Sequence, residues 1–179
     1  MSYRRNRLAL FGALAIALPG SATIAMAAEA NATAAATSMS SLVGTWLLST
    51  VDNLMPDGSK VHLYGAAPRG LLIFDADGRY TLQIMRGDRA RFASTDRALA
   101  TPAEYRAAVM GSNTHFGRFS VNEIDHTITF RIEHASFPNW DDTEQKRSFE
   151  IKDGRLSYIV PTPTTGAGAT GEVVWTRAR

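Results

Sequence analysis

The chain has 179 residues, of which 45% are hydrophobic and 20% are charged, and it carries a formal net charge of +2. That length is enough for one globular domain with its own core. Because the sequence contains no cysteine, it excludes disulfides, thiol catalysis, thiolate metal sites and a lipid-modified N-terminal cysteine.

The first 27 residues have the order of a secretory signal peptide. Arg4, Arg5 and Arg7 precede an apolar run over residues 8–18, and the small residues up to Ala27 provide a cleavage site. The apolar run is shorter than the roughly 20 residues that span a bilayer, so we expect no stable membrane anchor after cleavage. We therefore predict a periplasmic or secreted bacterial protein, with the general and the twin-arginine export routes both open.

Residues 28–40 are small, polar and without periodicity, which predicts a disordered leader. The folded domain is then expected over residues 41–179. Three of the 19 basic residues and none of the 17 acidic residues lie in the signal peptide, so the remaining chain is close to neutral. A nucleic-acid partner would lack its main electrostatic support, and we predict none.

From residue 42 onward, the sequence predicts β-strands separated by turn signals. Three connections are tight, over residues 75–78, 123–126 and 153–154, and the other four are long. Apolar and polar residues alternate along the strands, which is the pattern of an antiparallel sheet with one buried face. We therefore predict an all-β fold, an up-and-down antiparallel eight-stranded barrel. Its expected strands are 42–51, 70–75, 79–86, 115–122, 127–134, 146–152, 155–160 and 172–178.

One short helix is expected in the third connection, between residues 86 and 115. Thr101 is a suitable N-cap, Pro102 suits the first helical position, and Glu104 completes a capping box. Gly111 is expected to end the helix.

The two ends of this barrel should differ, because every tight turn falls at one end and every long loop at the other. Trp46 near the start of the first strand and Arg177 near the end of the last strand both lie at the tight-turn end. We predict that the Arg177 guanidinium covers the indole face when the barrel closes. Gly44 would let the chain cross close beneath. The alternative is a core tryptophan and an unrelated surface arginine.

These residues carry a resemblance. The Gly44-Thr45-Trp46 segment with a late Trp175-Thr176-Arg177 is similar to the Gly-x-Trp and closing arginine of lipocalins, a calycin signature. The segments "LVGTWLLSTVDN", "YGAAPRGLLIFDADGRYTLQIMR", "FGRFSVNE", "FPNW" and "WTR" resemble the bacterial lipocalin-like domain family over most of residues 42–177. The resemblance implies a small lipocalin-like barrel and, by analogy, a small apolar ligand. It implies no activity for particular residues.

Strand pairing around the 123–126 turn can be counted from the sequence. A tight turn there sets Phe119 opposite Phe130. The same count sets His115 opposite His134, near the long-loop end.

Four polar residues break the apolar pattern on the inward face at that end: Arg86, His115, His134 and Arg147. Charged groups on an apolar face are costly unless they are paired. We expect them to form an arc that binds the acidic head of a ligand, more strongly in mild acid if a histidine titrates near pH 6.5. The alternative is that the two arginines reach solvent at wet strand ends or pair with nearby carboxylates.

Aromatic residues on the long loops could form a rim around the ligand. Phe137 and Trp140 follow His134, and Tyr64 lies on the first long loop. They are as well placed to cap the core from above.

Three functions remain open on this sequence. The first is an exported lipocalin-like protein that binds a small, largely apolar molecule, for which the basic residues favour an acidic head. The second is a small-molecule isomerase or cyclase that uses His115 or His134 as acid or base. The third is an envelope protein whose interior is filled by aromatic rings. We expect no cofactor and no metal, because no third ligand stands at a fixed spacing from the two histidines.

Overall fold

The computed structural model describes residues 39–166 and 168–179. The predicted signal peptide and most of the predicted leader lie outside the described residues. Met39 and Ser40, at the end of the predicted leader, are helical, in a stretch that ends at Leu42.

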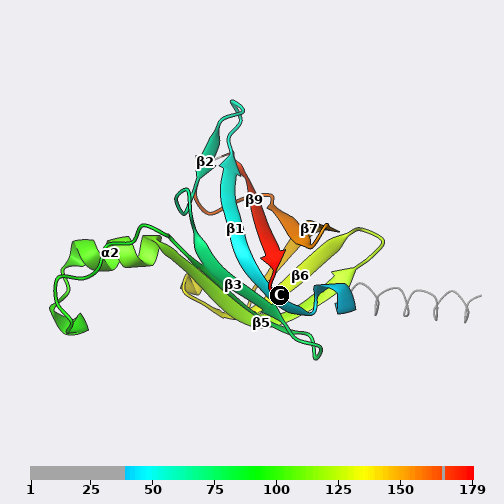
Figure 1. Cartoon of the computed structure of the whole chain (residues 1–179), viewed down its shortest axis with the longest axis horizontal. Coiled ribbons are helices and arrows are strands. Elements are labelled where there is room, and N and C mark those ends of the chain that lie inside the picture. The colour runs from blue at the N-terminus through cyan, green and yellow to red at the C-terminus, as the bar shows by residue number, and fades with distance from the viewer. Residues whose placement is uncertain (1–38, 167) are drawn as a thin grey trace, which may run out of the picture. The chain divides into compact units, whose positions relative to one another are not determined.

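Within the described residues, nine antiparallel strands form one sheet that closes on itself (Figure 1). Eight of them make the barrel, and β1 pairs with β9 to close it. The predicted eight-stranded barrel is therefore confirmed. The strands are β1 (Gly44–Leu54), β2 (Lys60–His62), β3 (Arg69–Phe74), β4 (Arg79–Met85), β5 (Ser112–Asn122), β6 (Thr127–Ala135), β7 (Glu144–Lys152), β8 (Arg155–Val160) and β9 (Thr170–Arg177).

The predicted short helix is α2 (Pro102–Met110), between β4 and β5. Thr101 caps it, and the capping box with Glu104 is complete. Two 3-10 turns, Arg97–Leu99 and Pro138–Trp140, lie in the long connections.

The strand β2 is not among the predicted strands. It has three residues, all exposed, and it pairs only with the far end of β1, beyond the barrel proper. Such a short, exposed segment has no buried face, so it leaves no alternating apolar pattern in the sequence.

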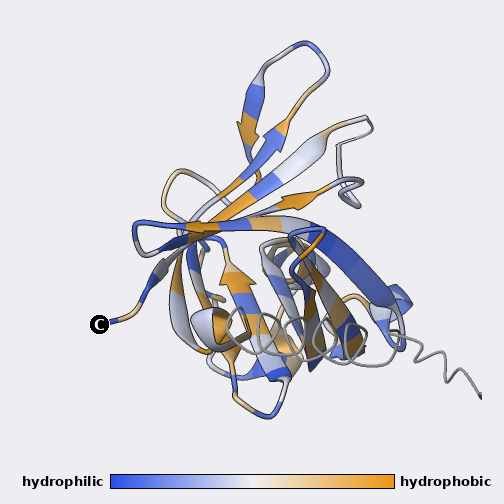
Figure 2. Cartoon of the chain, turned by 90° about the vertical axis from the view of Figure 1, so that its right-hand side faces the viewer, coloured by the Kyte–Doolittle hydropathy of each residue, from blue (hydrophilic) through white to orange (hydrophobic). Residues whose placement is uncertain are grey.

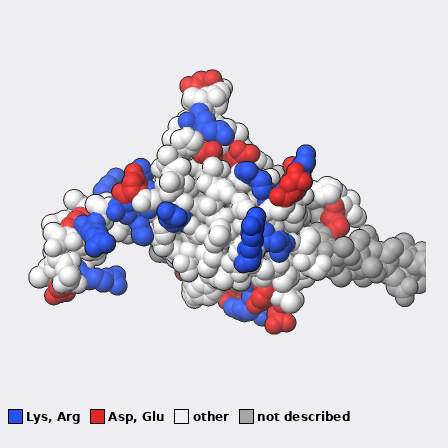
Figure 3. Space-filling model, in the orientation of Figure 1, with Lys and Arg blue, Asp and Glu red and all other residues white. Residues whose placement is uncertain are grey.

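The inside and outside of the barrel follow the alternation along each strand, which Figure 2 shows as changes of hydropathy along the ribbons. Along β4, Tyr80, Leu82 and Ile84 are each at most 4% exposed. Phe119 on β5 lies opposite Phe130 on β6, as predicted. On the face that Figure 3 shows, Lys and Arg are interspersed with Asp and Glu.

The tight-turn end is closed as predicted. The Arg177 guanidinium carbon lies 4.2 Å from the ring centroid of the fully buried Trp46. Arg177 also donates hydrogen bonds to the backbone carbonyls of Val43 and Ser41. At Gly44, φ is +127°, and a Cβ would lie 2.9 Å from Arg177 Nη1. Only glycine suits that backbone beneath the guanidinium.

Aromatic rings fill the half of the interior above this floor. The ring centroids of Phe74 and Phe119 are 4.6 Å apart, and those of Tyr80 and Phe130 are 4.8 Å apart. The half nearer the long loops is hollow. Among the described residues, no helix has the length and apolar character needed to cross a membrane.

Candidate functional site

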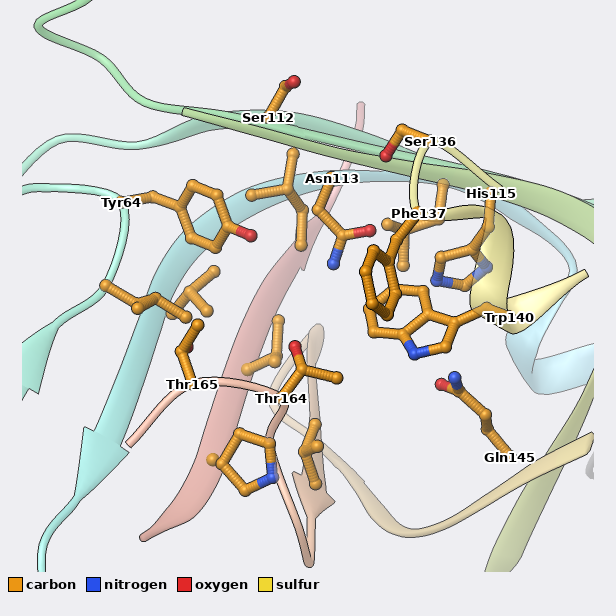
Figure 4. Close-up of a pocket in the computed structure, with 18 of the residues that line it drawn as sticks. Tyr64, Ser112, Asn113, His115, Ser136, Phe137, Trp140, Gln145, Thr164 and Thr165 are labelled. Carbon is orange, nitrogen blue, oxygen red and sulfur yellow. The ribbon is translucent and has the colours of Figure 1, made fainter. Parts of the chain in front are cut away.

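A cavity of about 430 Å³ occupies the long-loop half of the barrel. All four long connections contribute to its lining, so the predicted mouth is the observed one. Cavities of about 300–1,000 Å³ are typical of small-molecule sites. The walls are mostly aliphatic and aromatic, and Figure 4 shows the polar groups that interrupt them.

His115, on β5, is a buried polar group of the cavity, with 7% of its surface exposed. Its Nδ1 lies 2.8 Å from the Tyr80 hydroxyl oxygen. The rings of Phe130 and Trp140 meet the imidazole edge-on, with centroids 6.1 and 6.0 Å away. The ring is therefore fixed by packing on several sides.

Burial lowers the pKa of His115 to about 4, and the nearby Arg147 charge lowers it further. His115 is thus neutral at neutral pH. Our expectation that a histidine here strengthens anion binding in mild acid by titrating near pH 6.5 is wrong for His115, because an apolar, cationic surrounding disfavours its protonation.

Arg147, on β7, is half-buried and lines the cavity as predicted. Its Nη1 donates to the Lys146 carbonyl at 3.0 Å, and its Nη2 donates to Gln145 Oε1 at 2.5 Å. Burial lowers the pKa of the guanidinium, and no acidic side chain contributes to that pKa. Arg147 is the one charged residue among the described residues that line the cavity.

Trp140 and Phe137 stand at one side of the mouth, with their rings edge-on and their centroids 5.5 Å apart. Both belong to the loop between β6 and β7. Asp141 fixes this loop, since its Oδ1 accepts a hydrogen bond from the Ala135 backbone at 2.8 Å. Tyr64 faces them across the cavity and is 9% exposed (Figure 4). Burial raises the pKa of the Tyr64 hydroxyl, which therefore stays protonated.

His134 does not line the cavity, and its predicted pairing with His115 is wrong. The register shifts by one residue between Phe116 and Gly117, so that His134 pairs with Phe116 and points outward. Its side chain is 70% exposed and lies 3.1 Å from Asp141 Oδ2. His134 therefore contacts the Trp140 loop from outside.

The cause of this shift is a β-bulge in β6 opposite Gly117, where Glu133 is the extra residue between Ile132 and His134. A Cβ on Gly117 would lie 2.1 Å from the Arg131 carbonyl oxygen, so the two strands approach more closely than any other residue allows. An extra residue in one strand reverses the facing of everything beyond it. Glycine inside an alternating strand is the sequence signal that could have revealed the bulge.

Arg86 also lies outside the cavity lining. The strand β4 ends one residue before it, and its Nε donates to Asp88 Oδ1 at 2.8 Å. Arg86 therefore follows the alternative given in the sequence analysis, in which the arginine reaches solvent and pairs with a nearby carboxylate. The predicted arc of four basic residues is thus reduced to His115 and Arg147.

The cavity also contains polar residues that the sequence analysis missed. Gln145 precedes Arg147 by two positions on β7 and shares its facing, but the predicted strand began two residues too late. Asn113 precedes His115 by two positions, and its buried Oδ1 has no hydrogen-bond partner among the described residues. Residues 162–165, from the loop before β9, complete the lining.

Alternation alone could have extended the facing pattern to both Gln145 and Asn113. The loop residues could not be found in this way, because side chains in an irregular loop do not alternate between two faces. Asn53 Nδ2 donates to the Thr165 carbonyl at 2.9 Å, which holds this loop against β1. Among the residues that the structure describes, no cluster of His, Asp or Glu has the geometry of a metal site.

Residues 43–178 match the family model described as lipocalin-like domain. No match was found among curated proteins. The match spans the whole barrel, from the residue before β1 to the residue after β9, so the chain belongs to the lipocalin-like domain family.

Proposed function

We propose that this member of the lipocalin-like domain family binds a small, largely apolar molecule with an acidic head inside its barrel. The cavity of about 430 Å³ at the long-loop end is the observation that carries the proposal. Its aliphatic and aromatic walls favour an apolar body, because burying such surface is worth about 25 cal/mol per Å². Its one charged lining residue among those described, Arg147, favours an anion.

The proposed setting is outside the cytoplasm, in the periplasm or medium of a bacterium. It rests on the basic, apolar and small-residue order of the first 27 residues. It also suits a chain without cysteine, whose barrel depends on core burial instead of disulfides.

Acid–base catalysis at His115 is supported less well than binding. A general base must be able to take up a proton near the working pH, and burial lowers the pKa of His115 to about 4. No acidic side chain lines the cavity within the described residues to serve in its place.

Titration with N-phenyl-1-naphthylamine, a neutral apolar dye that fluoresces in apolar surroundings, tests the proposed cavity. We expect a saturable fluorescence increase at one dye per protein. The Val173→Phe variant places a ring in the cavity and should weaken dye binding by about tenfold or more.

The matched control is Val61→Phe, because Val61 is 47% exposed on β2 and does not line the cavity. Its dye affinity should equal that of the unmodified protein. Equal dye binding by all three proteins would show that the dye binds elsewhere, and an absence of dye binding would contradict an open apolar cavity.

A further inference from the structure

We propose that the bottom of the cavity is a carboxylate-binding subsite formed by His115 and Arg147, so that the ligand enters head first and leaves its apolar body at the mouth. This inference rests on the proposed binding function and goes beyond it by naming the head group and its orientation. It reverses the sequence-based expectation of an arc of basic residues just inside the mouth.

The position of the two residues supports the orientation. His115 contacts Tyr80 and Phe130, which belong to the ring cluster that fills the lower interior. Arg147 pairs with Ile128 on β6, a fully buried core residue. The mouth is formed instead by the loop residues, among them the apolar Phe137 and Met110. The charged end of the cavity is thus the deep end.

The hydrogen bond to Tyr80 determines what His115 offers to a ligand. Burial raises the pKa of the Tyr80 hydroxyl far above its usual range, so the hydroxyl keeps its proton. That proton has no acceptor among the described residues except His115 Nδ1, at 2.8 Å. If Nδ1 carried a proton as well, the buried O–H would be left unsatisfied, which is costly. Tyr80 therefore donates to Nδ1, and the neutral ring carries its own proton on Nε2.

This second nitrogen, Nε2, has no hydrogen-bond partner among the described residues. Its residue is 93% buried and borders the cavity (Figure 4). A buried N–H donor without a partner indicates an acceptor that arrives with the ligand or with water.

Arg147 adds charge to this donor. Two of its N–H groups are bound to the Lys146 carbonyl and to Gln145 Oε1, which leaves other donors of the fork for the cavity. Because Gln145 uses its oxygen on Arg147, its amide nitrogen is the group left for a ligand. Figure 4 shows Gln145 and Trp140 on the same side of the cavity.

The subsite is therefore rich in donors and carries a positive charge, with no acidic side chain among the described lining residues. A carboxylate has two acceptor oxygens and a negative charge, and it satisfies both a guanidinium and a neutral imidazole N–H. An alcohol would satisfy fewer donors, and an ammonium would add a second positive charge and repel Arg147.

Decanoate, decanol and decylamine share a ten-carbon chain and differ in the head group. Comparing their affinities therefore tests the preference for the head group. Their affinities are measured at pH 7 by displacement of N-phenyl-1-naphthylamine and by calorimetry. We expect decanoate to bind about tenfold or more tighter than decanol, and decylamine to bind most weakly.

The variant Arg147→Gln removes the charge and should weaken decanoate by about tenfold while changing decanol by less than about twofold. Arg118→Gln makes the same change on the exposed side of β5 and should alter neither. His115→Phe should weaken decanoate in the same selective way.

The positioning role of Tyr80 needs a readout that general destabilisation would not move. In ¹⁵N NMR of the unmodified protein, His115 should show the tautomer protonated on Nε2. Tyr80→Phe removes the donor to Nδ1 and should shift the tautomer balance, with a smaller loss of decanoate affinity than His115→Phe.

The outcomes separate the two proposals. If decanol and the dye bind in the cavity but decanoate binds no better, or if Arg147→Gln weakens both equally, the carboxylate subsite is wrong and the binding function stands. If neither the dye nor any of the three compounds binds, both proposals fail.

Discussion

The two ends of the barrel use an arginine in opposite ways. At the tight-turn end, Arg177 lies over Trp46 and donates to two backbone carbonyls. At the other end, Arg147 is half-buried beside a cavity, and no acidic group offsets its charge. The first guanidinium is satisfied within the fold. The second retains donors that the described residues leave unused.

This difference separates the arginine that closes the barrel from the arginine that we propose to bind the ligand. Every described contact of Arg177 closes the barrel, so removing this side chain should lower the free energy of unfolding. Arg147 costs free energy to bury and receives little in return from its described neighbours. The proposed carboxylate ligand would supply the partner that Arg147 lacks among the described residues.

The largest expected effect is at the closed end. Trp46→Ala should lower the free energy of unfolding by about 3–5 kcal/mol, because it removes a fully buried ring and the surface on which Arg177 lies. Denaturant titration measures this. Leu47→Ala, at a position 50% exposed on the same strand, should cost far less, and a similar loss in both would contradict the special role of the floor.

The next effect concerns pH and the open end. The pKa of His115 is about 4 in the fold and 6.5 in an exposed histidine. Below pH 6.5 the unfolded chain therefore takes up a proton that the folded protein does not. The free energy of unfolding should be at its full value above pH 6.5 and fall by about 3 kcal/mol as the pH drops to 4.

Denaturant titrations between pH 7 and 4.5 measure this slope. His115→Gln removes the titrating group and should flatten the curve in that window. Carboxylates with a lowered pKa, such as Asp88, affect the free energy of unfolding at more acidic pH. They therefore contribute little to the slope between pH 7 and 4.5. An unchanged slope in the variant would show that His115 is not the buried titrating group.

Exchanging each arginine for methionine compares the two ends directly. Arg177→Met should destabilise the protein by about 1–2 kcal/mol through the lost hydrogen bonds and indole contact. Arg147→Met should leave stability unchanged or raise it, because it removes a desolvated charge and keeps the apolar stem. Thermal and denaturant unfolding of both variants measure these changes. A larger destabilisation by Arg147→Met than by Arg177→Met would contradict the comparison.

The smallest effect is expected at His134. It lies outside the barrel and contacts Asp141 on an exposed surface, where ion pairs contribute little. His134→Ala should therefore change the affinity for N-phenyl-1-naphthylamine by less than about twofold. A large loss of affinity would mean that the outer contact controls the Trp140 loop, and through it the cavity.

The sequence predicted the barrel well because its signals are local and periodic. Alternation gives the buried face of Tyr80, Leu82 and Ile84, and the Asp153-Gly154 turn has the two positive φ angles of a tight hairpin. The contact of Trp46 with Arg177 followed from chain order and closure.

The site was predicted in part. The alternating pattern correctly placed His115 and Arg147 inside. A single bulge in β6, opposite Gly117, reversed His134, and the early end of β4 left Arg86 at the surface. Alternation gives no account of inserted residues unless a glycine is interpreted as a bulge. The lowered pKa of His115 depends on burial among rings from other strands, which a linear pattern does not contain.

The most direct test of the account is a crystal structure of the protein with decanoate. We expect the carboxylate within hydrogen-bond distance of the Arg147 guanidinium and of His115 Nε2, with the alkyl chain running toward Tyr64 and Phe137. Decanoate seated with its carboxylate at the mouth, or bound on the outer surface with the interior closed by the loops, would contradict it.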